Sequence, residues 1–123
     1  MATVLVIDDD EMVRTMLLRT LRRGGHTAVG ARDGAEGIAL FKENATDVVI
    51  TDIFMPNQEG LATIMELRRS FPAIRIIAIS GGGARASLDV LPVAEALGAR
   101  RTLRKPFTPA EVMEVVRQVL AET

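Results

Sequence analysis

The chain has 123 residues, 48% of them hydrophobic, and its 16 acidic residues nearly balance 15 basic ones. This length suits one domain and is too short for two that each bury a sizeable core, so we expect a single domain over residues 1–123. The near-neutral charge and the absence of Trp and Tyr provide little attraction for nucleic acid and few rings to stack on bases. We therefore expect no nucleic-acid binding by this domain.

The apolar runs are short. None approaches the ~18 residues of a membrane-spanning helix, and the first, Val4–Ile7, is followed at once by acidic residues, unlike a secretory signal. The absence of cysteine excludes a disulfide framework, a thiolate zinc site and a Cys nucleophile. These features predict a cytoplasmic protein without membrane insertion.

The first part of the chain predicts strand, helix and strand. Val4–Ile7 is typical of a buried strand. A helix with apolar residues at helical spacing follows, with Asp9 or Asp10 as its N-cap and Gly24-Gly25 at its end. Thr27–Ala31 is a weaker apolar run, as expected of a strand at the edge of a sheet.

The middle of the chain repeats this alternation. Asp33 caps a second predicted helix, and Val48–Thr51 is a β-branched run typical of a strand buried on both faces. A third amphipathic helix ends at Phe71-Pro72. The stretch Ile74–Ile79 (IRIIAI), apolar except for Arg75, predicts a fourth strand.

The last part predicts helix, strand and helix. The fourth helix either begins at an Asp89 cap, with Pro92 in its first turn, or is longer and kinked. Arg101–Arg104 predicts a short fifth strand. Thr108 and Glu111 have the spacing of a capping box at the start of the final helix. Five strands alternating with five helices predict one α/β domain with a parallel, doubly wound sheet between two helical layers.

Four predicted strands end on polar groups. Asp8 and Asp9 follow the first strand, Asp52 the third, Ser80 the fourth and Lys105 the fifth. Because parallel strands end at a common edge, these groups can converge. Clustered carboxylates repel unless a cation lies among them, and Mg²⁺ accepts a few carboxylates together with a phosphate oxygen. An ammonium and a hydroxyl suit the other oxygens of a phosphoryl group, which makes Asp52 the expected nucleophile.

Each of these groups also has a simpler interpretation. Residues 8–10 can merely cap a helix, and for acidic residues taken alone that is the commoner role. Asp52 can be a turn residue, Lys105 an exposed strand end, and Ser80 the start of a glycine-rich loop. Their joint placement at strand ends is what favours the chemical interpretation.

Four motifs carry a resemblance to a known family: VLVIDDD, VVITDIFMPNQEG, IIAISG and LRKPF. From Val4 to Leu120 the chain resembles the receiver domain of bacterial response regulators, including the single-domain chemotaxis type. The resemblance implies a flavodoxin-like (βα)5 three-layer fold with strand order 2-1-3-4-5. It also implies a signalling module of a two-component or phosphorelay system, which assists its own phosphorylation and dephosphorylation and is not an enzyme for a separate substrate.

The resemblance also implies roles for individual residues. Asp52 is the phosphoacceptor, and Asp8 and Asp9 are the acidic pair that holds Mg²⁺. Asp9 is the direct ligand of this pair, together with Asp52 and the backbone carbonyl of Phe54. Lys105 completes the phosphoryl site.

On phosphorylation, the resemblance implies that Ser80 and Lys105 move toward the phosphoryl group, and that the Lys105-Pro106 peptide is cis. The phosphoryl donor is a histidine kinase or a histidine phosphotransfer protein. A downstream protein binds the face formed by the fourth helix, the fifth strand and the fifth helix.

Three features depart from the family pattern. Thr102 occupies the position of an aromatic switch residue, which argues against signalling by an aromatic flip. Phe54 stands where the family often has a polar residue, so we expect it to alter water access and the lifetime of the phosphoryl group. The glycine-rich stretch from Ser80 to Asp89 predicts a long, mobile connection and a short fourth helix.

Two other functions are consistent with part of the sequence. A haloacid-dehalogenase-type phosphatase uses a DxD pattern that Asp8-Asp9-Asp10 satisfies, but Glu11 matches the following position poorly and the chain leaves no room for a cap domain. A receiver-like module that binds partners without phosphorylation is the other alternative. The intact acidic set and Lys105 argue against it.

Overall fold

A computed structural model describes residues 2–53, 59–81 and 95–122, and not the side chain of residue 59. The elements are β1 (Thr3–Ile7), α1 (Glu11–Arg23), β2 (Thr27–Ala31), α2 (Gly34–Glu43), β3 (Val48–Asp52), α3 (Glu59–Ser70), β4 (Ile76–Ser80), β5 (Arg101–Arg104) and α5 (Pro109–Ala121). None of the described helices is long and apolar enough to cross a membrane.

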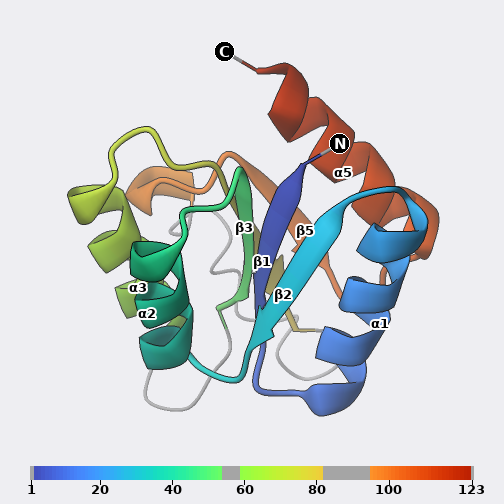
Figure 1. The fold of residues 1–123 in the computed structure, drawn as a ribbon, viewed down its shortest axis with the longest axis horizontal. Coiled ribbons are helices and arrows are strands. Elements are labelled where there is room, and N and C mark those ends of the chain that lie inside the picture. The colour runs from blue at the N-terminus through green and yellow to red at the C-terminus, as the bar shows by residue number, and fades with distance from the viewer. Residues whose placement is uncertain (1, 54–58, 82–94, 123) are drawn as a thin grey trace.

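The strands form one parallel sheet in the order β2-β1-β3-β4-β5. Helices α1 and α5 cover one face of this sheet, and α2 and α3 cover the other (Figure 1). This is the flavodoxin-like, doubly wound three-layer fold, so the predicted fold class and strand order are confirmed. The first strand lies inside the sheet and the second at its edge, as the sequence predicts.

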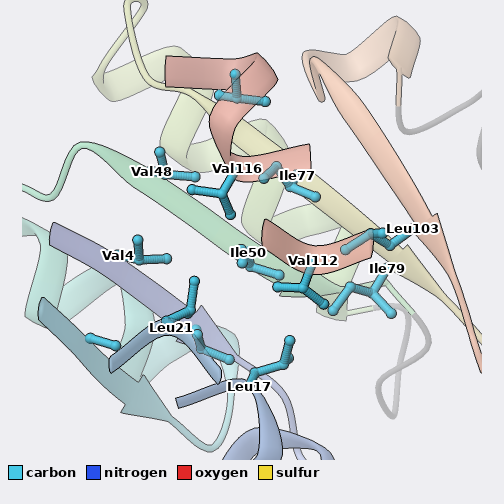
Figure 2. Close-up of a cluster of buried hydrophobic side chains, with 13 residues drawn as sticks. Val4, Leu17, Leu21, Val48, Ile50, Ile77, Ile79, Leu103, Val112 and Val116 are labelled. Carbon is cyan, nitrogen blue, oxygen red and sulfur yellow. The ribbon is translucent and has the colours of Figure 1, made fainter. Parts of the chain in front are cut away.

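Both faces of the sheet are packed. Along β1 the side chains alternate, so that Val4 and Val6 face α1 and α5 whereas Leu5 and Ile7 face α2 and α3. The cluster under α1 and α5 joins Leu17 and Leu21 to residues of the three central strands and α5 (Figure 2). Because side chains fix the central strands from both sides, the ends of these strands are rigid supports for a site.

The helix termini agree with the local signals of the sequence. Asp10, one of the two predicted alternatives, is the N-cap of α1 and accepts hydrogen bonds from the Met12 and Val13 amides. Asp33 caps α2. Thr108 and Glu111 form the predicted capping box of α5.

The fourth strand and the fourth helix differ from the prediction in position. β4 runs from Ile76 to Ser80, because the Ile74 amide donates to the Phe71 carbonyl in the turn after α3. The predicted start at Ile74 is therefore wrong by two residues. The Asp89 and Pro92 alternatives for the fourth helix lie outside the described residues, whereas residues 95–97 are helical and Gly98 follows them with a φ of 129°.

Packing of α1 provides a test of the fold. Leu17→Ala removes a side chain with no exposed surface, so we expect it to lower the free energy of unfolding by about 2–5 kcal/mol. Met12→Ala on the same helix removes a side chain that is 82% exposed and should change stability by less than about 0.5 kcal/mol. Urea denaturation followed by circular dichroism measures both. Equal effects of the two substitutions would contradict the packing described above.

Candidate functional site

The predicted site residues meet at the carboxyl edge of the sheet. Asp8 directly follows β1, Asp52 is the last residue of β3, and Ser80 is the last residue of β4. The strand register places Asp52 beside Ile79 and Ser80 beside Arg104, immediately before Lys105. The parallel sheet therefore brings together residues that are up to 97 positions apart (105 minus 8) in the sequence.

Three carboxylates form the centre of the site. Asp8, Asp9 and Asp52 each place one carboxylate oxygen so that the three oxygens lie within 4.8 Å of one another. Asp8 and Asp52 are buried and Asp9 is exposed. The Asp10 amide donates to Asp8 Oδ1 over 2.9 Å, which fixes the orientation of the Asp8 carboxylate. The cluster thus has two fixed acids beneath one that faces solvent.

Lys105 supplies the cation nearest to these acids. Its Nζ lies 3.2 Å from Asp52 Oδ2 and 3.6 Å from Asp8 Oδ2. The Lys105 amide donates to the Ser80 carbonyl over 3.0 Å, which holds the start of this side chain beside the end of β4. The Lys105-Pro106 peptide is cis, as the family resemblance implies.

Burial and neighbouring charges shift the pKa values of Asp8 and Lys105. Burial raises the pKa of the Asp8 carboxyl to about 6, and the neighbouring Asp52 and Asp9 charges add to this, while the Asp10 amide and Lys105 oppose it. Burial by itself would lower the pKa of Lys105, but attraction to the Asp52 and Asp8 carboxylates outweighs burial and raises it. Lys105 therefore stays charged, whereas Asp8 takes up a proton at a higher pH than an ordinary aspartate does, even with Lys105 beside it.

Two buried oxygens at this site make no hydrogen bond with any described residue: Asp8 Oδ2 and Ser80 Oγ. Leaving a buried polar atom unsatisfied typically costs about 1–3 kcal/mol. Asp8 Oδ2 belongs to an all-oxygen, all-carboxylate donor set, which is the type that Mg²⁺ accepts. Ser80 Oγ is a hydroxyl without an acceptor among the described residues, and a phosphoryl oxygen is an acceptor of the kind it lacks. The residues therefore fit a divalent cation and a phosphoryl group.

Residues 4–117 match the family model for the response regulator receiver domain. The chain belongs to the receiver domain family. Receiver domains are the phosphoacceptor modules of two-component systems, generally bind Mg²⁺ through an acidic pocket, and interact with histidine kinases and downstream effectors.

Curated relatives of different size contain a similar receiver domain. The chemotaxis protein CheY of Thermotoga maritima is 34% identical over 119 residues, which cover 94% of this chain and 95% of that protein. The sensor kinase CckA of Brucella abortus is 32% identical over 121 residues, covering 97% of this chain and 12% of that protein. The response regulator MprA of a Mycobacterium species is 33% identical over 120 residues, covering 98% of this chain and 51% of that protein. The chain thus spans from about an eighth of the length of these relatives to nearly their whole length.

Solved structures agree with the fold. The receiver domain of NtrX from Brucella abortus superimposes with a TM-score of 0.90 at 26% identity, covering 98% of this chain and 99% of that one. A receiver domain protein from Clostridium thermocellum gives a TM-score of 0.87 at 31% identity, with 98% and 94% covered. The chemotaxis response regulator CheY4 of Vibrio cholerae gives 0.85 at 29% identity, with 98% and 99% covered.

Gly60 is a residue of this receiver domain that the sequence reasoning missed. A Cβ at this position would lie 2.5 Å from the Asp52 carbonyl oxygen, and closer still to the Ile53 Cα. The first turn of α3 therefore lies directly against the backbone of Asp52. A glycine in the first turn of a predicted helix was the available signal, but its meaning depends on which backbone the fold places beside it.

Of the three departures from the family pattern, only Thr102 lies wholly among the described residues. Phe54 and most of the glycine-rich connection after Ser80 lie outside the described residues. Thr102 is a partly buried residue of β5 and pairs with Ala78 of β4. It has no ring that a rotamer change could move between interior and surface.

The raised pKa of Asp8 predicts that Asp8→Asn stabilises the metal-free receiver domain at neutral pH. The folded state binds a proton at Asp8 between pH about 6 and 3.8, where the unfolded state does not, so unfolding free energy falls as pH rises through this window. Removing the charge should add about 1–3 kcal/mol at pH 7.5. The difference from wild type should shrink at pH 4.5.

Denaturant titrations in EDTA at both pH values measure this effect. If Asp8→Asn is less stable than wild type at pH 7.5, the prediction is wrong. If its gain in unfolding free energy is the same at both pH values, the gain does not come from the raised pKa of Asp8. Asp47→Asn is the matched control, because Asp47 lies at the opposite end of β3 and accepts a hydrogen bond from the Thr3 amide.

For Gly60→Ala two physical effects have opposite signs. Helix propensity alone would make the variant about 1 kcal/mol more stable. The collision with the backbone of Asp52 and Ile53 cannot be relieved by a rotamer change and should instead cost about 1–3 kcal/mol or more. We expect a net loss of unfolding free energy. A stabilised variant in the same denaturation assay would show that α3 does not press on this backbone.

Proposed function

We propose that this chain is a single receiver domain over residues 1–123 that accepts a phosphoryl group on Asp52, with Mg²⁺, in the cytoplasm. The donor is a histidine kinase or a histidine phosphotransfer protein. The observation that carries the proposal is the position of the Asp52 carboxylate, which is buried, lies 3.2 Å from the Lys105 ammonium and is clustered with Asp8 and Asp9. Ionisable groups clustered in this way around one buried carboxylate are typical of functional sites.

Asp8, Asp9 and Asp52 would hold the Mg²⁺ ion. Family resemblance adds the backbone carbonyl of Phe54, and assigns direct ligation to Asp9 and Asp52. A bound Mg²⁺ ion neutralises negative charge on phosphoryl oxygens during transfer. Asp8 Oδ2 supports this assignment. It accepts no hydrogen bond from the described residues, and its ion-pair partner Lys105 Nζ lies 3.6 Å away, so a cation or its bound water would give this oxygen a closer partner.

The transfer itself forms one bond and breaks one. A carboxylate oxygen of Asp52 attacks the phosphorus of the donor phosphohistidine, and the P–N bond breaks with its electron pair remaining on the imidazole nitrogen. Lys105, 3.2 Å from Asp52 Oδ2, is placed to balance the negative charge that the phosphoryl oxygens bring to this acid. The burial of Asp52 fixes the attacking group and lowers the cost of its orientation.

The switch would use groups that gain contacts only after phosphorylation. Ser80 Oγ has no hydrogen-bond partner among the described residues, so a phosphoryl oxygen would offer it an acceptor. The Lys105 amide is bonded to the Ser80 carbonyl, and this bond couples the two movements. We infer that the signal is read by a downstream protein on the face of the fourth helix, β5 and α5, without an aromatic switch at Thr102.

Asp52→Asn tests the proposal. Incubated with acetyl phosphate and Mg²⁺, the wild type should gain one phosphoryl group, detected by intact-protein mass spectrometry, and Asp52→Asn should gain almost none, because its side-chain amide is not a nucleophile. Asp47→Asn, at the other end of the same strand, should behave as wild type. Wild-type stoichiometry in Asp52→Asn would overturn the assignment.

The same proteins distinguish the phosphatase alternative. Sustained hydrolysis of a phosphomonoester that is lost in Asp8→Asn and kept in Asp52→Asn would indicate a haloacid-dehalogenase-type enzyme. Asp8 Oδ1 already accepts a hydrogen bond from the Asp10 amide, which makes this oxygen less available as an attacking group.

A further inference from the structure

Arg14 makes a contact that the phosphorylation chemistry does not itself require. It lies in the first turn of α1, is partly buried, and donates through Nη1 to the backbone carbonyl of Asp8 over 2.9 Å. Its own amide donates to the Asp10 carbonyl. Long helical side chains point back toward the N-terminus of their helix, and this is what brings the guanidinium to the loop that holds the acidic residues.

Gly30 of β2 provides the path for this side chain. A Cβ on Gly30 would lie 3.1 Å from Leu18 Cδ1, 3.2 Å from Arg14 Cδ and 3.3 Å from Arg14 Cγ, so the Arg14 methylenes pass over this residue beside Leu18. Gly30 is paired with Val6 inside the strand, where glycine typically costs about 0.5–1 kcal/mol relative to alanine. The missing side chain allows Arg14 to cross the strand and reach Asp8.

The Asp8 carbonyl belongs to the peptide whose nitrogen is that of Asp9. A guanidinium bonded to this carbonyl therefore fixes the peptide plane from which the Asp9 side chain projects. Asp9 is exposed, and its carboxylate accepts no hydrogen bond from the rest of the described chain. Backbone orientation is thus the main means by which the fold can hold this carboxylate within 4.8 Å of the other two.

We propose that Arg14 is a positioning residue for the cation site, which acts on Asp9 through the Asp8 carbonyl and depends on the gap above Gly30. This inference rests on the proposed function, since it assumes that Asp9 ligates Mg²⁺. If Arg14 has this role, removing its guanidinium lowers Mg²⁺ affinity by more than the accompanying loss of unfolding free energy explains. Partners that orient ligands from outside the coordination sphere typically contribute about 10–100-fold to metal affinity.

The test is Mg²⁺ titration of the intact chain by calorimetry or NMR, since the chain has no Trp or Tyr to report binding. Arg14→Met should weaken Mg²⁺ binding about tenfold or more. Arg14→Lys, which keeps one cationic donor, should recover part of the loss. Arg19→Met is the matched control, because it removes the same charge from an exposed position of the same helix, and should bind Mg²⁺ nearly as wild type does.

Gly30→Val tests the path without altering Arg14. The branched side chain would displace the Arg14 methylenes and the Leu18 side chain, so Mg²⁺ affinity should fall although valine favours a strand. In the Arg14→Met background, Gly30→Val should cost no further affinity, because the guanidinium that donates to the Asp8 carbonyl is already absent. Unfolding free energies in EDTA for all variants separate a loss of folding from a loss of metal binding.

Two results would overturn this inference. Suppose that the Mg²⁺ affinity of Arg14→Met is within about twofold of that of Arg19→Met, while its unfolding free energy in EDTA falls. Arg14 is then only a structural residue, and the proposed function stands. If the wild-type chain does not bind Mg²⁺, or if Asp9→Asn binds it as wild type does, the proposed metal site is wrong and the role of Arg14 is rejected with it.

Discussion

The ion pairs of Lys105 with Asp52 and Asp8 are the contacts on which the site depends. One ammonium lies 3.2 Å and 3.6 Å from two buried carboxylates, while a third carboxylate lies close by. With every acid ionised, these four groups carry two negative charges in excess (three minus one). The described chain compensates for this only in part, by raising the pKa of Asp8. The proposed cation site therefore rests on a charge imbalance that the fold itself produces.

The hydrophobic sheet makes this concentration of charge possible. β3 and β4 are buried along their whole length, and the residues paired next to the acids, such as Ile7 with Thr51 and Asp52 with Ile79, have little or no exposed surface. Strands packed on both faces cannot move apart to relieve repulsion at their ends. The packing of the apolar core therefore offsets the repulsion between the clustered carboxylates. A ligand that binds between them would relieve this repulsion.

The local features of the fold could be predicted because their causes are local. Asp10, Asp33 and Thr108 cap helices through contacts two or three residues away. The convergence of the acids followed from one rule, that parallel strands end at a common edge. The start of β4 could not be read, because Ile74 continues the apolar run and is buried, although its backbone belongs to a turn. Gly60 and Arg14 contact backbone from other elements, which no local pattern encodes.

The same geometry limits how a signal can leave the site. A ligand shifts a conformational equilibrium only through contacts that differ between the two states. On the proposed function, those contacts are made by Ser80 Oγ and Lys105, and the bond between the Lys105 amide and the Ser80 carbonyl links them. β5 ends immediately before Lys105 and pairs with β4 at Ser80. A pull on these two side chains therefore acts first on the edge of the sheet formed by β4 and β5. Thr102 of β5 carries no ring that could rotate, so on the proposed function we expect displacement of the β4 and β5 backbone to alter the surface there.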